Sequence, residues 1–300
     1  MLLSSSCPRH RGLCIGQCRL EKCYRNITLK KLITTLCAAL ACSFLFTATP
    51  VYADNAYTMT TVKSHLSVWS NGKNKVYLKD ITKKNKDGID EIVEQKLYLK
   101  DVKTGKSKLL KTITLDPESE ECCYLNNVYK TTVYMNRVRG VGDGDLYTYN
   151  WKTGKFKCVR KNFIIINASG KYMITANYLP TDISPYPAYL YKITSKGLEK
   201  VKKLGAYTTQ AQFAGRKIYY AKFPSNGSIR QMSVWTCDLS GKNAKEIFRT
   251  KAKDEQGYVM LEQVDENSFV YVEVPADGDP VYYRFDMKTE KTTQIPESEV

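Results

Sequence analysis

Histidine is almost absent from this chain of 300 residues, and acidic residues are outnumbered by basic ones. The two histidines exclude a histidine-rich metal site. Asp and Glu total 30 against 46 Lys and Arg, which gives a net charge of +16. The hydrophobic content of 43% and charged content of 25% exclude wholesale disorder, a collagen-like chain and a polytopic membrane protein.

Catalytic motifs are also missing. The chain has no Gly-x-Ser-x-Gly sequence, which excludes an attached hydrolase domain of that type. His65 is the one histidine after residue 53, so a Ser–His or Cys–His nucleophile would depend on it alone. It stands beside Leu66 and near Trp69, where a structural role is more frequent than a catalytic one.

Residues 1–53 have the layout of a leader and signal peptide. An uncharged run extends from Leu32 to Ala53, follows two lysines and ends in a small-x-small cleavage site. We expect cleavage after Ala53 and a secreted or cell-surface protein. The alternative is an uncleaved anchor, because the 22 uncharged residues reach the ~20 that a bilayer requires. Contact with a membrane is expected only through this segment.

The segment 1–28 is unusual for a secretory leader, because it carries four cysteines without zinc-ligand spacing. Leu29 and the two lysines after it look like the start of a bacterial signal peptide. We therefore expect translation to begin at Leu29, which would make 1–28 a start-site artefact. The mature protein is then a single domain, 54–300. Seven of the basic and one of the acidic residues lie in 1–53, so 54–300 keeps a net charge of +10.

Four cysteines remain after residue 53: Cys122, Cys123, Cys158 and Cys237. Export permits disulfides. However, Cys122 and Cys123 are adjacent and would point to opposite faces of a strand. Buried or free thiols are therefore favoured over disulfides.

A repeat is the main signal in the sequence. A Leu-Tyr-type strand is followed by a polar residue and a turn, and this pattern occurs five times at intervals of 49, 44, 44 and 48 residues. The turn is Thr-Gly in the first two copies and Ser-Gly in the fourth, and the other two copies are weaker. The copies lie at 97–106, 146–155, 190–197, 234–241 and 282–289. The second position is aromatic in every copy: Tyr98, Tyr147, Tyr191, Trp235 and Tyr283.

Each copy predicts a strand, a tight turn and a second strand, because glycine accepts the positive φ of the turn. Another hairpin precedes the copies, as in 163–166 with 172–175, 210–213 with 218–221, and 260–264 with 269–274. Four short antiparallel strands in each repeat predict an all-β protein, a β-propeller of five four-stranded blades. A two-sheet sandwich is the alternative, although it does not require so regular a period. Residues 54–64 are expected to supply a strand that latches the ring.

The repeats resemble those of secreted bacterial β-propellers of the TolB or WD-like type. The likeness rests on Ser169-Gly170-Lys171, Leu146-Tyr147 and Thr153-Gly154-Lys155, and it covers about 65–296. It is specific for architecture and implies little about function. The chain differs from TolB-type proteins in having five copies, where six to eight are common.

Turns inside the Thr-Gly hairpins are expected on one face of the propeller. Lysines gather there, which predicts a basic rim for polyanions such as acidic glycans. The rim residues are Lys103, Lys106, Lys152, Lys155, Lys288 and Lys291. The alternative is that these lysines only keep hairpin edges soluble.

The middle connections of the blades are expected on the other face, at 83–94, 137–145, 178–188, 223–231 and 275–280. They are longer and unlike one another, which favours a specific binding role there. The third is stiffened by prolines and carries aromatic residues, which suits a sugar or a peptide. The candidate ligand-binding residues on this face are Tyr178, Asp182, Tyr186 and Phe223.

Three middle connections hold Asp-Gly-type sequences whose carboxylates are candidates for a Ca²⁺ site. The residues are Asp87, Asp90, Asp143, Asp145, Asp277 and Asp279. None matches a full calcium loop, and Asp-Gly is also common in hairpin turns. We therefore expect no obligatory cofactor.

These features predict a non-catalytic extracellular binding or scaffold module for a protein or a cell-envelope glycan. Nucleic acid is not expected as a partner, because the chain is predicted to be exported and lacks a groove-reading helix. The alternative is a glycan-active enzyme, because five-bladed propellers include glycosidases with paired carboxylates in the central funnel. No such pair can be chosen by motif, and no catalytic residue is named.

Overall fold

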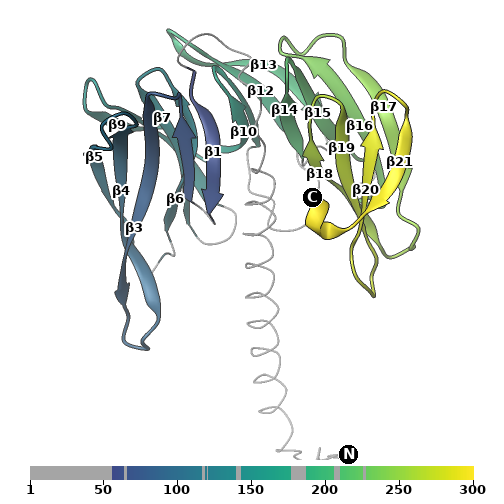
Figure 1. Ribbon diagram of the computed structural model, residues 1–300, viewed down its shortest axis with the longest axis horizontal. Coiled ribbons are helices and arrows are strands. Elements are labelled where there is room, and N and C mark those ends of the chain that lie inside the picture. Colours follow the sequence, from purple (N-terminus) through teal and green to yellow (C-terminus); the bar gives the residue numbers. More distant parts are fainter. Residues whose placement is uncertain are drawn as a thin grey trace, which may run out of the picture.

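The computed structural model describes residues 56–300 apart from 64–65, 117–118, 120, 140–142, 177–186, 206–209 and 226–227. These residues form an all-β structure of five antiparallel sheets, each built from strands that are consecutive in the chain (Figure 1). The described part contains no α-helix and one short 3₁₀ helix, η2 (Glu297–Glu299). No helix in this part is long and apolar enough to cross a membrane.

The first sheet has five strands and the other four have four each. The first sheet contains β1 (Thr58–Lys63), β2 (Leu66–Ser70), β3 (Asn74–Lys84), β4 (Asp90–Asp101) and β5 (Ser107–Thr114). The second contains β6 (Cys122–Tyr129), β7 (Thr132–Arg139), β8 (Asp143–Asn150) and β9 (Lys155–Arg160). The third contains β10 (Ile164–Ser169), β11 (Tyr172–Ala176), β12 (Ala188–Thr194) and β13 (Gly197–Gly205).

The fourth sheet contains β14 (Ala211–Ala214), β15 (Lys217–Lys222), β16 (Gln231–Asp238) and β17 (Lys245–Lys251). The fifth contains β18 (Tyr258–Val264), β19 (Ser268–Val274), β20 (Val281–Asp286) and β21 (Lys291–Ile295). The prediction of five propeller blades is confirmed, and β1 is the one strand beyond the expected four in each blade.

The sequence repeat sets how neighbouring sheets pack. Its first residue is fully buried in four copies and faces the next sheet, as Leu97 does in the apolar core between the first and second sheets. Its aromatic second residue faces the preceding sheet, as Tyr191 does in the core that contains Tyr134 and Leu146 of the second sheet. Alternation along a strand turns successive side chains to opposite faces, so one strand serves two cores.

Amide side chains tie the first sheet to the second, the second to the third and the fourth to the fifth. Gln95 accepts a hydrogen bond from Cys123 N–H at 2.7 Å and donates to Cys123 O at 3.2 Å. Asn136 bonds in the same way to Ile165 N–H and Phe163 O. The first strands of several sheets carry β-bulges at or near these bonds, for example between Ile165 and Asn167. A bulge removes ladder partners from backbone groups, and the amide side chains satisfy some of those groups.

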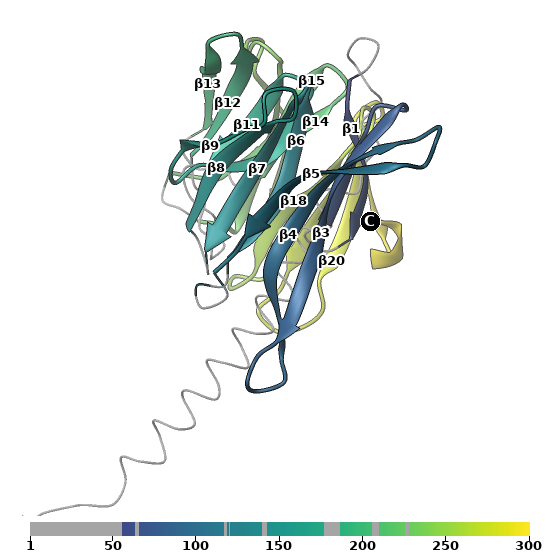
Figure 2. The same ribbon diagram turned by 90° about the vertical axis from the view of Figure 1, so that its left-hand side faces the viewer.

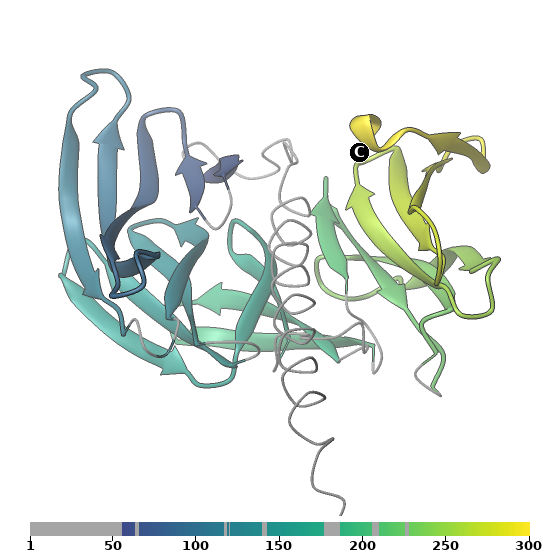
Figure 3. The same ribbon diagram turned by 90° about the horizontal axis from the view of Figure 1, so that it is seen from below.

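The sheets form an open arc and contact one another in chain order. The innermost contacts are made by β2 with β6, β6 with β10, β10 with β14 and β14 with β18. The first and fifth sheets lie at the two ends of the arc (Figure 3). Residues 54–64 were expected to latch the ring, and this expectation is wrong, because β1 pairs with β2 in the first sheet rather than with a strand of the fifth.

The connections divide between the two ends of the arc. The turns joining the last two strands of each sheet lie at the upper end in Figure 1, and we call this the lysine end. The middle connections lie at the opposite end. The hairpin of β3 and β4 extends furthest there (Figure 2). It was predicted as a long loop, but pairing continues to Lys84 and Asp90 and leaves a short turn at 85–89.

Candidate binding surfaces

The lysine end is built from five equivalent hairpin turns. In each turn a polar side chain at the end of the preceding strand bonds to backbone N–H groups of the turn. Asp286, for example, accepts hydrogen bonds from Lys288 N–H at 3.0 Å and Thr289 N–H at 2.7 Å. The backbone and hydroxyl of Thr289 thereby hold the pKa of the Asp286 carboxyl below its ordinary value. Asn150 and Thr194 cap the turns of the second and third sheets without a charge.

The predicted rim lysines all lie at this end and are exposed. They occupy or flank the turns of the first, second and fifth sheets: Lys103, Lys106, Lys152, Lys155, Lys288 and Lys291. None of the six is ion-paired with a carboxylate within the described ranges. The arrangement therefore presents ammonium groups to solvent at the equivalent turns of three of the five sheets.

The predicted aromatic binding surface at the opposite end is described only in part. Tyr178, Asp182 and Tyr186 lie outside the described residues. Phe223 is 8% exposed and packs in the core between the fourth and fifth sheets, so it is not a surface residue as the sequence suggested. The position of Phe223 at the start of a connection gave no indication that this ring would be needed in the core.

The six candidate calcium ligands are dispersed. Asp90 pairs with Lys84 at 3.5 Å, and the buried Asp145 pairs with Arg139 at 3.0 Å. Asp87, Asp277 and Asp279 are exposed in hairpin turns, and Asp143 begins β8. No three His, Cys, Asp or Glu side chains gather as a metal site in the part that the structure describes. Calcium binding remains a prediction.

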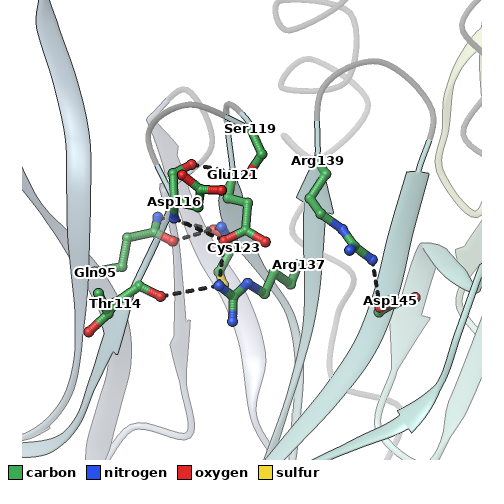
Figure 4. A network of polar contacts seen from close by, with 9 residues as sticks. All are labelled: Gln95, Thr114, Asp116, Ser119, Glu121, Cys123, Arg137, Arg139 and Asp145. Carbon is green, nitrogen blue, oxygen red and sulfur yellow. Dashed lines mark hydrogen bonds and ion pairs between the residues drawn. The ribbon is translucent and has the colours of Figure 1, made fainter.

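A polar network not foreseen from the sequence lies between the first and second sheets, near the opposite end (Figure 4). Glu121 forms an ion pair with Arg137, whose guanidinium also donates to Thr114 O at 3.2 Å. Burial is the largest single effect on the pKa of Glu121 and acts to raise it. The hydrogen bonds from Arg137 and from Asp116 N–H, together with the charges of Arg137 and Arg139, outweigh burial and lower the pKa. Arg137 holds Glu121 and Arg139 holds Asp145, which favours a structural role for these two carboxylates over acid–base chemistry.

Glu262 is the carboxylate on the first strand of the fifth sheet, β18. Burial raises the pKa of Glu262 above its ordinary value, and no other charged group described contributes to that shift. A carboxyl with a raised pKa can serve as a general acid. Glycoside hydrolysis needs a second carboxylate at a defined distance, and that partner remains a prediction.

No protein-family model and no curated protein matches the chain. Solved structures similar to it include an oligogalacturonate lyase in complex with manganese, at 15% identity and a TM-score of 0.45 over 75% of this chain and 62% of that one. TolB from Acinetobacter baumannii matches at 14% identity and a TM-score of 0.40, over 76% of this chain and 52% of that one.

An uncharacterised protein from Listeria monocytogenes EGD-e matches at 12% identity and a TM-score of 0.44, over 82% and 84% of the two chains. The chain spans less than two thirds of the lyase and of TolB. At these levels of similarity no activity, ligand or partner is transferred to this chain.

Proposed function

We propose that the protein is a non-catalytic extracellular module whose lysine end binds an anionic cell-envelope glycan. The supporting observation is the recurrence of exposed lysines at equivalent turns of the arc. A polymer with repeated negative charges matches a row of positive charges held at fixed intervals by a rigid scaffold. A single hairpin lysine would be explained by solubility alone, but repetition on one end favours a ligand.

The aspartates of the turns neutralise the neighbouring lysines only in part, because hydrogen bonds hold their carboxylates in the turns. The carboxylates of Asp101 and Asp286 accept hydrogen bonds from turn backbone groups, which fixes them beside the strand ends. The turn of the second sheet carries Asn150 in that position and keeps both Lys152 and Lys155. The second sheet therefore contributes the least compensated charge.

The test is retention of the purified protein on cell walls of the producing organism over a salt series. We expect retention to fall steeply with salt, because exposed charges are screened. The variant K152Q/K155Q/K288Q/K291Q should bind about thirty-fold more weakly at low salt, since each exposed charge contributes on the order of 0.5 kcal/mol. Wall binding that survives high salt and ignores these substitutions would refute the proposal.

A matched control separates location from net charge. The variant K83Q/K86Q removes two exposed lysines from the hairpin at the opposite end, and K152Q/K155Q removes two from the lysine end. We expect only the second variant to lose retention. Equal losses would mean that overall charge, and not the lysine end, attracts the wall.

A glycan-active enzyme is the second candidate, and Glu262 is the observation that favours it, because its raised pKa suits proton donation. An enzyme of this kind would release reducing ends from wall polysaccharides, and E262Q would abolish the release without changing retention. Release that is absent, or unaffected by E262Q, would remove this candidate.

A further inference from the structure

The first sheet has a face that no other described sheet covers. Its opposite face packs on the second sheet, where Trp69 Nε1–H donates to Leu125 O at 3.1 Å and Val76 and Leu97 are fully buried. Alternation along the strands therefore turns the intervening side chains away from the second sheet. The fifth sheet, which would cover this face in a closed ring, lies at the far end of the arc (Figure 3). We call this surface the free face.

A hydrophobic row crosses the middle of the free face. Val68, Tyr77, Tyr98 and Leu109 are direct cross-strand partners on β2, β3, β4 and β5. The two tyrosine rings stack with their centroids 5.5 Å apart and their planes at 17°. The Tyr77 hydroxyl lies 3.2 Å from the Ser107 hydroxyl, and Leu109 is 46% exposed. The row thus offers apolar surface and hydroxyl groups together.

Lysines flank this row on both sides along the strands. Lys75 is paired with Lys100 toward the lysine end, and Lys79 with Lys96 toward the opposite end. Like charges directly opposite in a sheet are destabilising. None of the four is ion-paired with a carboxylate of the described chain, although Glu94 lies further along β4. An anionic ligand would relieve the repulsion within both pairs.

The repeat argues against another sheet as the natural cover of this face. The residue at the fourth position faces the preceding sheet and is buried and apolar in four copies: Tyr149, Ile193, Cys237 and Phe285. In the first copy this position is Lys100. A fifth-sheet face or a second copy of the chain would have to bury that ammonium, which is costly without a paired acid. The lysine at this position of the first copy therefore indicates that the free face stays exposed and can bind polar ligands.

We infer that the free face binds an acidic glycan whose charged sugars alternate with neutral ones. The inference rests on the proposed function and extends it, because the Lys75–Lys100 pair continues directly from the turn that carries Lys103 at the lysine end. Four residues separate Lys75 from Lys79, a distance of about 13 Å along a strand. Two acid groups at such a separation would each meet a lysine pair, with a neutral sugar over the tyrosines.

The tyrosine geometry favours a glycan over a nucleic acid. Base stacking requires an open aromatic face. Tyr77 and Tyr98 each use one face for the other ring. The strand register places an aliphatic residue on the outer side of each, Val68 beside Tyr77 and Leu109 beside Tyr98. The surface presented to a ligand is then made of ring edges and hydroxyl groups, which suit the C–H and O–H groups of a sugar.

The test is titration of the purified full chain with three polysaccharides of equal length. Hyaluronan alternates a uronic acid with a neutral sugar, polygalacturonate carries a carboxylate on every sugar, and dextran carries none. We expect hyaluronan to bind most tightly and dextran not to bind. The variants K75Q/K100Q and K79Q/K96Q should each weaken hyaluronan binding about five-fold, whereas K83Q/K86Q should match the wild type. Unchanged binding by both face variants, or equal affinity for hyaluronan and polygalacturonate, would overturn the inference.

Two further measurements distinguish a glycan site on the free face from self-association and from binding at the lysine end alone. A change in molecular mass of K75Q/K100Q on analytical ultracentrifugation would show that the face joins two copies, and would overturn glycan binding there. If K152Q/K155Q/K288Q/K291Q loses binding and the face variants keep it, the proposed function stands and this inference falls. If only the face variants lose binding, the free face, and not the lysine end, is the glycan site.

Discussion

Individual amide side chains hold the arc together at the points where its sheets meet. Gln95, Asn136 and Gln212 each bond to a main-chain N–H and a main-chain carbonyl of the following sheet. All three are buried, so their polar atoms have no water to replace a lost partner. The sequence did not indicate this role, because a glutamine or asparagine in a strand has no local pattern that distinguishes it from a solvent-facing residue.

Substitution of Asn136 tests the role of these amides. Asn136→Ala leaves Ile165 N–H and Phe163 O without their partner, and we expect a loss of about 2–3 kcal/mol in the free energy of unfolding. Urea denaturation measures the loss. Asn267→Ala, in an exposed turn, is the control and should change stability by less than about 0.5 kcal/mol. Equal effects of the two substitutions would contradict the assignment.

The turn carboxylates at the lysine end give a second prediction at this scale. Hydrogen bonds from the threonines of their turns lower the pKa of Asp101 and Asp286, so both should titrate below the ordinary ~3.9 in carbon-detected NMR. Because the folded-state pKa is the lower one, the turns contribute stability above the unfolded-state pKa and lose it as the pH falls through the folded value.

A single substitution supplies the internal control for this titration. Thr289→Ala removes one hydroxyl donor to Asp286 and should raise the pKa of that carboxyl, while Asp101 keeps its own donor, Thr104. Identical shifts of both groups would show that the general field of the lysine end, and not turn geometry, sets these pKa values.

At the level of strands, the close approach of β8 to the third sheet depends on Gly144. A Cβ at this position would overlap the Cδ1 of Ile164, and Gly144 O accepts a hydrogen bond from Phe163 N–H at 2.8 Å. Glycine is therefore required by packing here and not by backbone conformation. From the sequence, the acidic residues beside Gly144 were interpreted as part of a turn or a calcium site. The packing of Gly144 against Ile164 could not be predicted, because a contact between two sheets produces no recognisable local sequence pattern.

A compensating pair tests this contact. Gly144→Ala should destabilise the protein by about 1–3 kcal/mol through overpacking. Ile164→Val removes the Cδ1 atom that the new methyl group would overlap, so the double variant should recover part of the loss relative to the sum of the single effects. Strict additivity in thermal or urea unfolding would show that the two positions do not meet.

The strands themselves were largely predictable, and the reason lies in the repeat. Each copy of the repeat has an apolar residue followed by an aromatic one, and successive residues of a strand point to opposite faces of the sheet. Leu146 and Tyr147 therefore indicated a strand that packs on both faces. The turn glycines Gly105, Gly154 and Gly241 have positive φ as expected. What could not be predicted was the partner of β1, because an isolated strand pattern does not specify which sheet edge it joins.

At the scale of the whole molecule, the described sheets make their main contacts with their neighbours in the chain. Phe269 lies in the core between the fourth and fifth sheets with Phe248 and Phe285 at ring centroid distances of 5.3 and 4.9 Å. Loss of one such core need not weaken the contact between the first and second sheets, as in proteins whose repeats interact only with adjacent repeats.

Hydrogen exchange with Phe269→Ala tests this coupling. We expect a loss of about 3–5 kcal/mol in that core and faster exchange in the fourth and fifth sheets, with protection retained in β2, β3 and β4. Leu97→Ala, in the core between the first and second sheets, should give the reverse pattern. A uniform loss of protection with either variant would show that the arc unfolds as one unit.

The positions of the first and last strands of the domain also determine how the molecule would respond to mechanical tension. β1 and β21 are each hydrogen-bonded to one neighbouring strand only, β2 and β20 respectively. Pulling on the two ends of the domain would load these strands first and peel their ladders one bonded pair after another. Because no described strand joins the fifth sheet to the first, each sheet that yields lengthens the chain without the resistance of a closed ring. A protein built this way would extend in steps while the sheets furthest from the pull stay folded.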